Sequence, residues 1–189
     1  MKTNFFLFNI FKSSNAQLRE LNINTIRFGV EGAKAIAEAL IINTQLTKLE
    51  MRDNIIGDEG TKAIAEALKI NVYLKKLDIG KNKIGDEGAK AIFDALKTEP
   101  GTTARVLSKT KLEKLSLSNN DFTADTIVYI VKSLIRNKTL TMVNLSLYKK
   151  KEFMEDIKKA IIIKEKIKNL KNKRIQMNLP PKLDILFQL

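Results

Sequence analysis

Apolar residues recur along this chain with a period of 28 residues, and each period combines two patterns. At its head, apolar residues at the first, fourth and sixth positions, as in Leu46, Leu49 and Met51, predict a short strand with one buried side. In its second half, as in residues 63–68, apolar residues three and four apart predict an amphipathic helix. Copies of the block begin at Leu18, Leu46, Leu74 and Leu112, and a decayed copy begins at Leu140. Such units bury their apolar sides only by stacking, so the pattern predicts a solenoid.

An asparagine follows the strand in three of these blocks, at Asn54, Asn82 and Asn120. An asparagine side chain both donates and accepts hydrogen bonds, so it can satisfy backbone groups of its own turn and of the next one. Stacked copies are therefore expected to form an asparagine ladder inside the bend.

A pair of acidic residues follows in two consecutive blocks, in the segments Gly57-Asp58-Glu59-Gly60 and Gly85-Asp86-Glu87-Gly88. We expect Asp58 and Asp86 to cap their own helices and each following glutamate to lie in the first helical turn. The fourth block lacks the motif, and Thr123 takes the capping position there. Two adjacent acids also suit a metal site or acid–base chemistry, but their recurrence at a helix start favours capping.

The heads of the form Leu46-x-x-Leu49-x-Met51-x-x-Asn54 and the segment from Gly57 to Leu68 resemble leucine-rich repeats of the ribonuclease-inhibitor type. That subfamily includes repeat regions of innate-immune receptors and of Ran GTPase-activating proteins. The resemblance covers about residues 18–147. It implies a right-handed α/β solenoid, a segment of the leucine-rich-repeat horseshoe, with a parallel inner sheet and outer helices. It also implies protein binding through the inner face and adjoining loops; a GTPase regulator is a more distant alternative, since the catalytic arginine loop of that family has no match here.

The repeats divide the chain into three parts. Residues 1–17 are expected to form an N-terminal cap or partial repeat, with a short signal peptide as the alternative. Residues 18–147 hold the repeats, with an insertion at 98–111 that predicts a protruding loop. Residues 148–189 predict a basic capping helix, from Glu152 to about Lys173, that holds no further strand head. The apolar tail that follows, from Ile175 to Leu189, is expected to pack on the C-terminal edge of the repeats, with a partner-binding motif as the alternative.

The side chains that flank the buried leucines are expected to form columns on the inner face, about 4.8 Å apart. The first column would be Glu20, Lys48, Lys76, Lys114 and Met142; the second Asn22, Glu50, Asp78, Ser116 and Asn144; the third Asn24, Arg52, Gly80, Ser118 and Ser146. The lysines lie beside acids, which would cancel much of their field, and no aromatic residue offers a base a stacking surface. We therefore expect a protein-binding face, formed by Lys48, Glu50, Arg52, Lys76, Asp78, Lys114, Ser116, Ser118 and Asn144.

Composition narrows the function further. The chain has no cysteine and no histidine, which excludes disulfides, thiol nucleophiles, imidazole catalysis and zinc sites built on those residues. No apolar run is long enough to span a membrane. We expect a monomeric, cytoplasmic, non-enzymatic protein-interaction module without a cofactor; secretion or delivery into a host cell is the alternative location.

The positive charge suggests a second function. The net charge is +13, and the segment Lys149–Arg174 alone, with 11 basic and 4 acidic residues, carries +7 of it. This segment could dock on nucleic acid or on an anionic membrane, and such binding would collapse as salt rises. The alternative, which we favour, is that its lysines keep a capping helix in solution.

Overall fold

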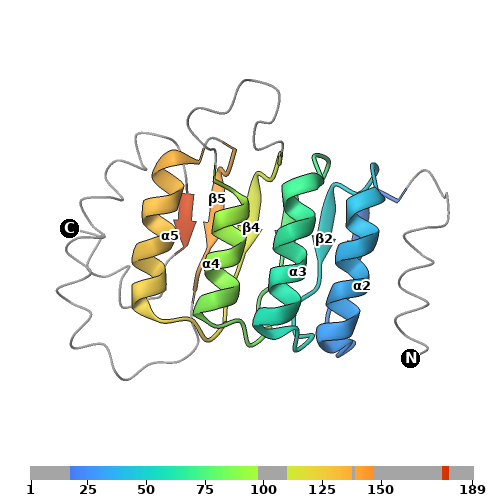
Figure 1. Cartoon of the computed structure of the whole chain (residues 1–189), viewed down its shortest axis with the longest axis horizontal. Helices are drawn as coiled ribbons and strands as arrows, with labels where there is room; N and C mark the ends of the chain where they lie inside the picture. The colour runs from blue at the N-terminus through green and yellow to red at the C-terminus, as the bar shows by residue number, and fades with distance from the viewer. Residues whose placement is uncertain (1–17, 98–109, 138, 147–175, 179–189) are drawn as a thin grey trace.

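The strands form one parallel sheet in chain order, and the helices stand side by side along one face of it (Figure 1). The computed structural model describes residues 18–97, 110–137, 139–146 and 176–178. The strands are β1 (Glu20–Asn22), β2 (Lys48–Glu50), β3 (Lys76–Asp78), β4 (Lys114–Ser116), β5 (Met142–Asn144) and β6 (Gln176–Asn178). The helices are α2 (Gly29–Ile42), α3 (Gly57–Ile70), α4 (Asp86–Ala95) and α5 (Ala124–Arg136). This arrangement confirms the predicted α/β solenoid.

The leucines at the centre of the strands line up as the repeat predicts. Leu49, Leu77 and Leu115 are partners in neighbouring parallel strands, and each is at most 2% exposed. Leu21 occupies the same position in β1 but is only partly buried. The repeat therefore places one shared apolar row behind the sheet, where the helices cover it.

The buried faces of the helices are wider than their stripe predicts. In α3, Ala65 is buried together with Ile64, Ala67 and Leu68, whereas Ala63, expected inside, is only partly buried. A helix in a solenoid contacts the helices on both sides as well as the sheet, so more than one stripe of its surface is covered.

The asparagine ladder is confirmed. The backbone N–H of Asn54 donates to Oδ1 of Asn82 at 2.8 Å, and the N–H of Asn82 donates to Oδ1 of Asn120 at 2.8 Å. Each Nδ2 group then donates back to the preceding repeat, as Asn82 does to the carbonyl of Met51 at 2.9 Å. All three asparagines are buried. Each side chain thus supplies hydrogen bonds that the bent backbone cannot make by itself.

A second set of asparagines, which the repeat motif did not predict, follows the C-terminal ends of α2, α3 and α5. Asn71 ends α3, and its Nδ2 donates to the carbonyl of Leu40 at 2.7 Å and to that of Asn43 at 2.9 Å. Asn137 occupies the same position after α5 and donates to the carbonyl of Leu96 at 2.9 Å. The sequence feature that could have predicted this set is the 28-residue spacing of Asn43 and Asn71.

The prediction that Asp58 caps its own helix is wrong. Asp58 caps the helix of the next repeat instead. Helix α3 starts at Gly57 after Ile56, which places Asp58 inside its first turn. Oδ1 of Asp58 instead accepts the N–H groups of Gly85 at 2.7 Å and of Gly88 at 2.9 Å, at the start of α4. A Cβ at Gly88 would lie 2.6 Å from this oxygen, so the close approach requires glycine. The capping prediction was right in its chemistry and wrong in the helix.

Asp86 repeats this arrangement toward α5. Its Oδ1 accepts the N–H of Thr123 and the hydroxyl of Thr126, both at 2.7 Å, and the hydroxyl of Thr123 also donates to this carboxylate. Thr123 is the N-cap residue of α5, as expected, but its hydroxyl makes no capping bond. Burial works to raise the pKa of the Asp86 carboxyl, but the bonds from both threonines outweigh it and lower that pKa.

A sixth strand, which the repeat pattern did not predict, lies at the start of the apolar tail. Strand β6 pairs in parallel with β5, and Met177 lies opposite Val143. The predicted N-terminal cap at 1–17, the inserted residues 98–109 and the predicted basic helix lie outside the described residues. Among the helices that are described, none is long and apolar enough to cross a membrane.

Candidate protein-binding face

The face of the sheet opposite the helices carries the predicted columns. Strand register places Glu20, Lys48, Lys76, Lys114 and Met142 in the first column, and Asn22, Glu50, Asp78, Ser116 and Asn144 in the second. These strands are parallel and in register, so equivalent residues of successive repeats are direct neighbours. The inner face is therefore an ordered array of polar side chains, built on the row of buried leucines.

The predicted site residues gather in one place. A shallow depression of about 280 Å³ is lined by Lys48, Glu50, Lys76, Asp78, Lys114, Ser116, Met142 and Asn144, together with the central leucines. Of the predicted site residues, only Arg52 and Ser118 lie outside it, because they belong to the third column beyond the strand ends. Met142 adds an apolar element that was not among the predicted site residues.

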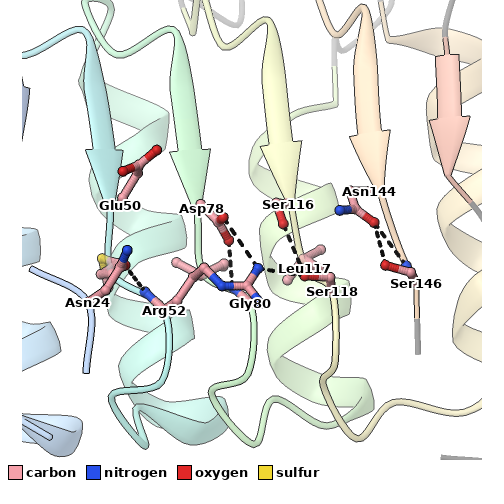
Figure 2. A network of polar contacts seen from close by, with 12 residues as sticks. Asn24, Glu50, Arg52, Asp78, Gly80, Ser116, Leu117, Ser118, Asn144 and Ser146 are labelled. Carbon is pink, nitrogen blue, oxygen red and sulfur yellow. Dashed lines mark hydrogen bonds and ion pairs between the residues drawn. The ribbon is translucent and has the colours of Figure 1, made fainter. Parts of the chain in front are cut away.

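Arg52 is held in a network that joins four repeats (Figure 2). Its guanidinium Nη1 donates to Oγ of Ser118 at 2.9 Å and lies 3.5 Å from Oδ2 of Asp78. The backbone N–H of Arg52 donates to Oδ1 of Asn24 at 2.6 Å. The guanidinium is therefore fixed by partners in the two following repeats, which reduces the rotamer freedom that an arginine loses on binding.

Gly80 makes this position of Arg52 possible. A Cβ at Gly80 would lie 2.7 Å from Nη1 of Arg52 and 2.8 Å from Oγ of Ser118. The missing side chain leaves the space over which the guanidinium passes from the second repeat to the fourth (Figure 2). The backbone N–H of Gly80 also donates to Oδ1 of Asp78 at 2.9 Å, so that carboxylate is occupied from two directions.

The three lysines of the first column differ in their counter-charges. Nζ of Lys48 lies 2.9 Å from a carboxylate oxygen of Glu50 and 3.3 Å from one of Glu20, and these hydrogen bonds raise the pKa of Lys48. Lys76 and Lys114, directly opposite each other in β3 and β4, form no ion pair or hydrogen bond with another described side chain. Neighbouring acids therefore neutralise the charge of Lys48, as expected, but not the charges of Lys76 and Lys114.

A second, larger depression lies where the strands turn toward the helices, and no motif had indicated a site there. It has a volume of about 620 Å³ and is lined by Asp53, Ile55, Lys81, Lys83, Asn119, Asn120 and Asp121. Nζ of Lys81 lies 2.7 Å from Oδ2 of Asp53 across neighbouring turns. Five of these residues, among them Ile55, have a positive φ, a backbone conformation that residues other than glycine rarely adopt. Because this strain recurs from turn to turn, it belongs to the repeat.

A charged cluster joins α4 to α5. Nζ of Lys97 donates to the hydroxyl of Tyr129 at 2.7 Å, and the hydroxyl donates to the Asp94 carboxylate, which also pairs with Lys97. These bonds to Asp94 and Tyr129 raise the pKa of Lys97; burial opposes ionisation of Asp94, but its bonds lower its pKa overall. The cluster thus joins residues on the two sides of the insertion. Within the described ranges, no group of three or more acidic residues could hold a metal ion.

The fold and the polar inner face define a solenoid of leucine-rich repeats. A model of the leucine-rich repeat matches residues 43–65, 71–93 and 108–130 of this chain. No curated protein matches the sequence.

Two solved structures show the same fold over most of their length. One is described as leiomodin-1 actin-binding site 2; it has 22% identity and a TM-score of 0.62, and the match covers 89% of this chain and 92% of that one. The other is the tropomodulin C-terminal domain of Caenorhabditis elegans, with 17% identity, a TM-score of 0.62, and coverage of 90% and 95%. At this identity the similarity establishes the fold alone.

Proposed function

We propose that this chain is a non-enzymatic interaction module that binds a protein partner through the inner face of its sheet. The observation that carries the proposal is the depression over β2 to β5, whose charged and polar lining lies on the side opposite the core. The buried leucines and the asparagine ladder hold the repeats together without these side chains. Charged residues that the fold does not require are available for recognition.

The chemistry of the face suits a protein surface. Both signs of charge, a hydroxyl, an amide and one methionine line the same depression. Arginine and methionine are enriched at protein interfaces, and an arginine already fixed by Asp78 and Ser118 loses less entropy when a partner binds. Assignment of the repeats to the ribonuclease-inhibitor type is part of this proposal, supported by the 28-residue period and by the Gly57–Gly60 turn.

Actin is the first defined partner to test, because one structural neighbour is described as an actin-binding site. That neighbour supplies a candidate, and the inner face supplies the surface on which it can be tested. Binding of purified actin would be measured by sedimentation, and capture from a cell extract would extend the search to other proteins.

A bulky neutral substitution tests the face itself. Ser116 is half-buried in the depression, and among the described residues its hydroxyl contacts only Oγ of Ser118, at 3.3 Å. Ser116→Tyr should fill the depression and weaken a bound partner at least about tenfold, whereas Ile70→Tyr, at a 56% exposed position ending α3, should not. A partner that binds the Ser116→Tyr protein as tightly as the wild type would contradict the proposed binding face.

A further inference from the structure

Lys76 and Lys114 hold two positive charges in a place where the described part of the fold offers them no counter-charge. They are register partners on neighbouring strands, about 4.8 Å apart at the backbone, and both line the depression. The nearest acids of the second column are already occupied, Glu50 by Lys48 and Asp78 by Arg52 and the N–H of Gly80.

The fold itself does not require this pair of lysines. Like charges directly opposite each other on adjacent strands destabilise a sheet, and each of these exposed side chains can be replaced by a neutral residue without loss of core packing. Carboxylates placed between two ammonium groups would remove the repulsion and add charge-assisted hydrogen bonds. Two positive charges that have no counter-charge among the described residues would thus gain one in a complex with an acidic partner.

We infer that Lys76 and Lys114 bind an acidic segment of the protein partner, with two carboxylates over β3 and β4 and an apolar side chain over Met142. The inference rests on the proposed function, because it concerns the same face. The order of the strands sets the direction in which this segment lies. On the β2 side, Lys48 is already paired with Glu20 and Glu50, whereas on the β5 side Met142 follows Lys114. Carboxylates about 5–7 Å apart, at i and i+4 of a helix or i and i+2 of a strand, match this spacing.

Charge complementarity favours a protein segment over nucleic acid. A phosphate backbone carries a charge at every nucleotide, so it would bring further negative charges against Glu50 and Asp78 in the same depression, whereas a segment with two carboxylates places them over Lys76 and Lys114 alone. The described columns of the inner face contain no aromatic side chain on which a base could stack. Two lysines also neutralise only two phosphates, which gives weak binding at physiological salt.

The test uses the full chain and two short labelled peptides that differ only in charge. One peptide carries two glutamates followed by a leucine in a serine–glycine background, and the other has glutamines in place of the glutamates. Binding is measured by fluorescence anisotropy at about 50 mM and about 300 mM NaCl, between which screening of exposed charges changes strongly. Lys76→Gln with Lys114→Gln is compared with Lys62→Gln and Lys132→Gln, two exposed lysines on α3 and α5 that remove the same charge.

We expect the wild type to bind the acidic peptide about tenfold more tightly than the glutamine peptide at low salt, with the preference shrinking at high salt. The inner-face double variant should lose the preference, and the helix double variant should keep it. Equal binding of both peptides, or a preference that survives Lys76→Gln with Lys114→Gln, would overturn the inference. So would tighter binding of a single-stranded oligonucleotide that depends on the same two lysines.

The variants also separate this inference from the proposed function. If Ser116→Tyr removes a protein partner but the Lys76 and Lys114 double variant retains it, the inner face binds proteins without an acidic segment. If both variants retain the partner, the proposed binding face is wrong as well. Urea denaturation of the double variant should show stability equal to or slightly above that of the wild type, because repulsion is removed.

Discussion

Replacing Asn82 by alanine tests the asparagine ladder at its central position. The side chain is fully buried and makes three hydrogen bonds. Its Oδ1 accepts the N–H of Asn54 at 2.8 Å, and its Nδ2 donates to the carbonyls of Met51 at 2.9 Å and Gly80 at 3.1 Å. Alanine removes all of them and leaves the backbone of two successive turns without these partners.

The expected loss follows from the number of groups left without a partner. The carbonyl of Gly80 still accepts the N–H of Asp53 at 3.1 Å, so the N–H of Asn54 and the carbonyl of Met51 are the groups most affected. A buried polar group without a partner costs about 1–3 kcal/mol, which gives about 2–6 kcal/mol for the two. A domain is stable by about 5–15 kcal/mol, so the change is a large part of the total.

Urea denaturation followed by far-UV circular dichroism measures this loss. Asn22→Ala is the matched control, because Asn22 is exposed and its side chain makes one hydrogen bond within the described part of the chain, accepting the N–H of Asn24 at 3.1 Å. The control should cost less than about 0.5 kcal/mol. A loss for Asn82→Ala no larger than that of the control would refute the role of the ladder. A smaller denaturant slope for Asn82→Ala would show that the repeats on its two sides unfold separately.

Three further substitutions test contacts between repeats, each followed by urea denaturation. Gly80→Ala places a methyl group 2.7 Å from Nη1 of Arg52 and should displace the guanidinium at a cost of about 1–3 kcal/mol; unchanged stability, or an unchanged guanidinium position in a crystal structure, would contradict this. Asp86→Ala removes the cap of α5 and should cost about 0.5–2 kcal/mol at pH 7. The lowered pKa of Asp86 means that its stabilisation is present above its ordinary value of 3.8 and is lost as the pH falls through the folded-state pKa; the variant should therefore lose less stability than the wild type on acidification, and equal losses would contradict the assignment. Tyr129→Phe removes the hydroxyl that bonds Lys97 and should cost about 0.5–1.5 kcal/mol at pH 7, and no loss would show that the cluster does not join α4 to α5.

The 28-residue repeat was enough to predict the fold, the strand register and the ladder of Asn54, Asn82 and Asn120. The physical reason is that each repeat packs on a copy of itself, so a position in one repeat has the same position in the next as its neighbour. The columns of the inner face follow from the same rule, so the period alone places the residues of the candidate site beside one another. Strand β6 was missed because its head no longer carries the leucine pattern.

Only the tertiary structure decided which side chains bond to which. Asp58 reaches the helix of the following repeat, and Arg52 passes over Gly80 to Ser118 in the repeat beyond. These pairings depend on side-chain length and on the space that a glycine leaves, neither of which is encoded in the period. The same pairings decide the electrostatics, because Arg52 occupies Asp78 and leaves Lys76 without a counter-charge among the described residues. The sequence alone thus determined where the charged residues lie, and the tertiary contacts determined which charges remain for a partner.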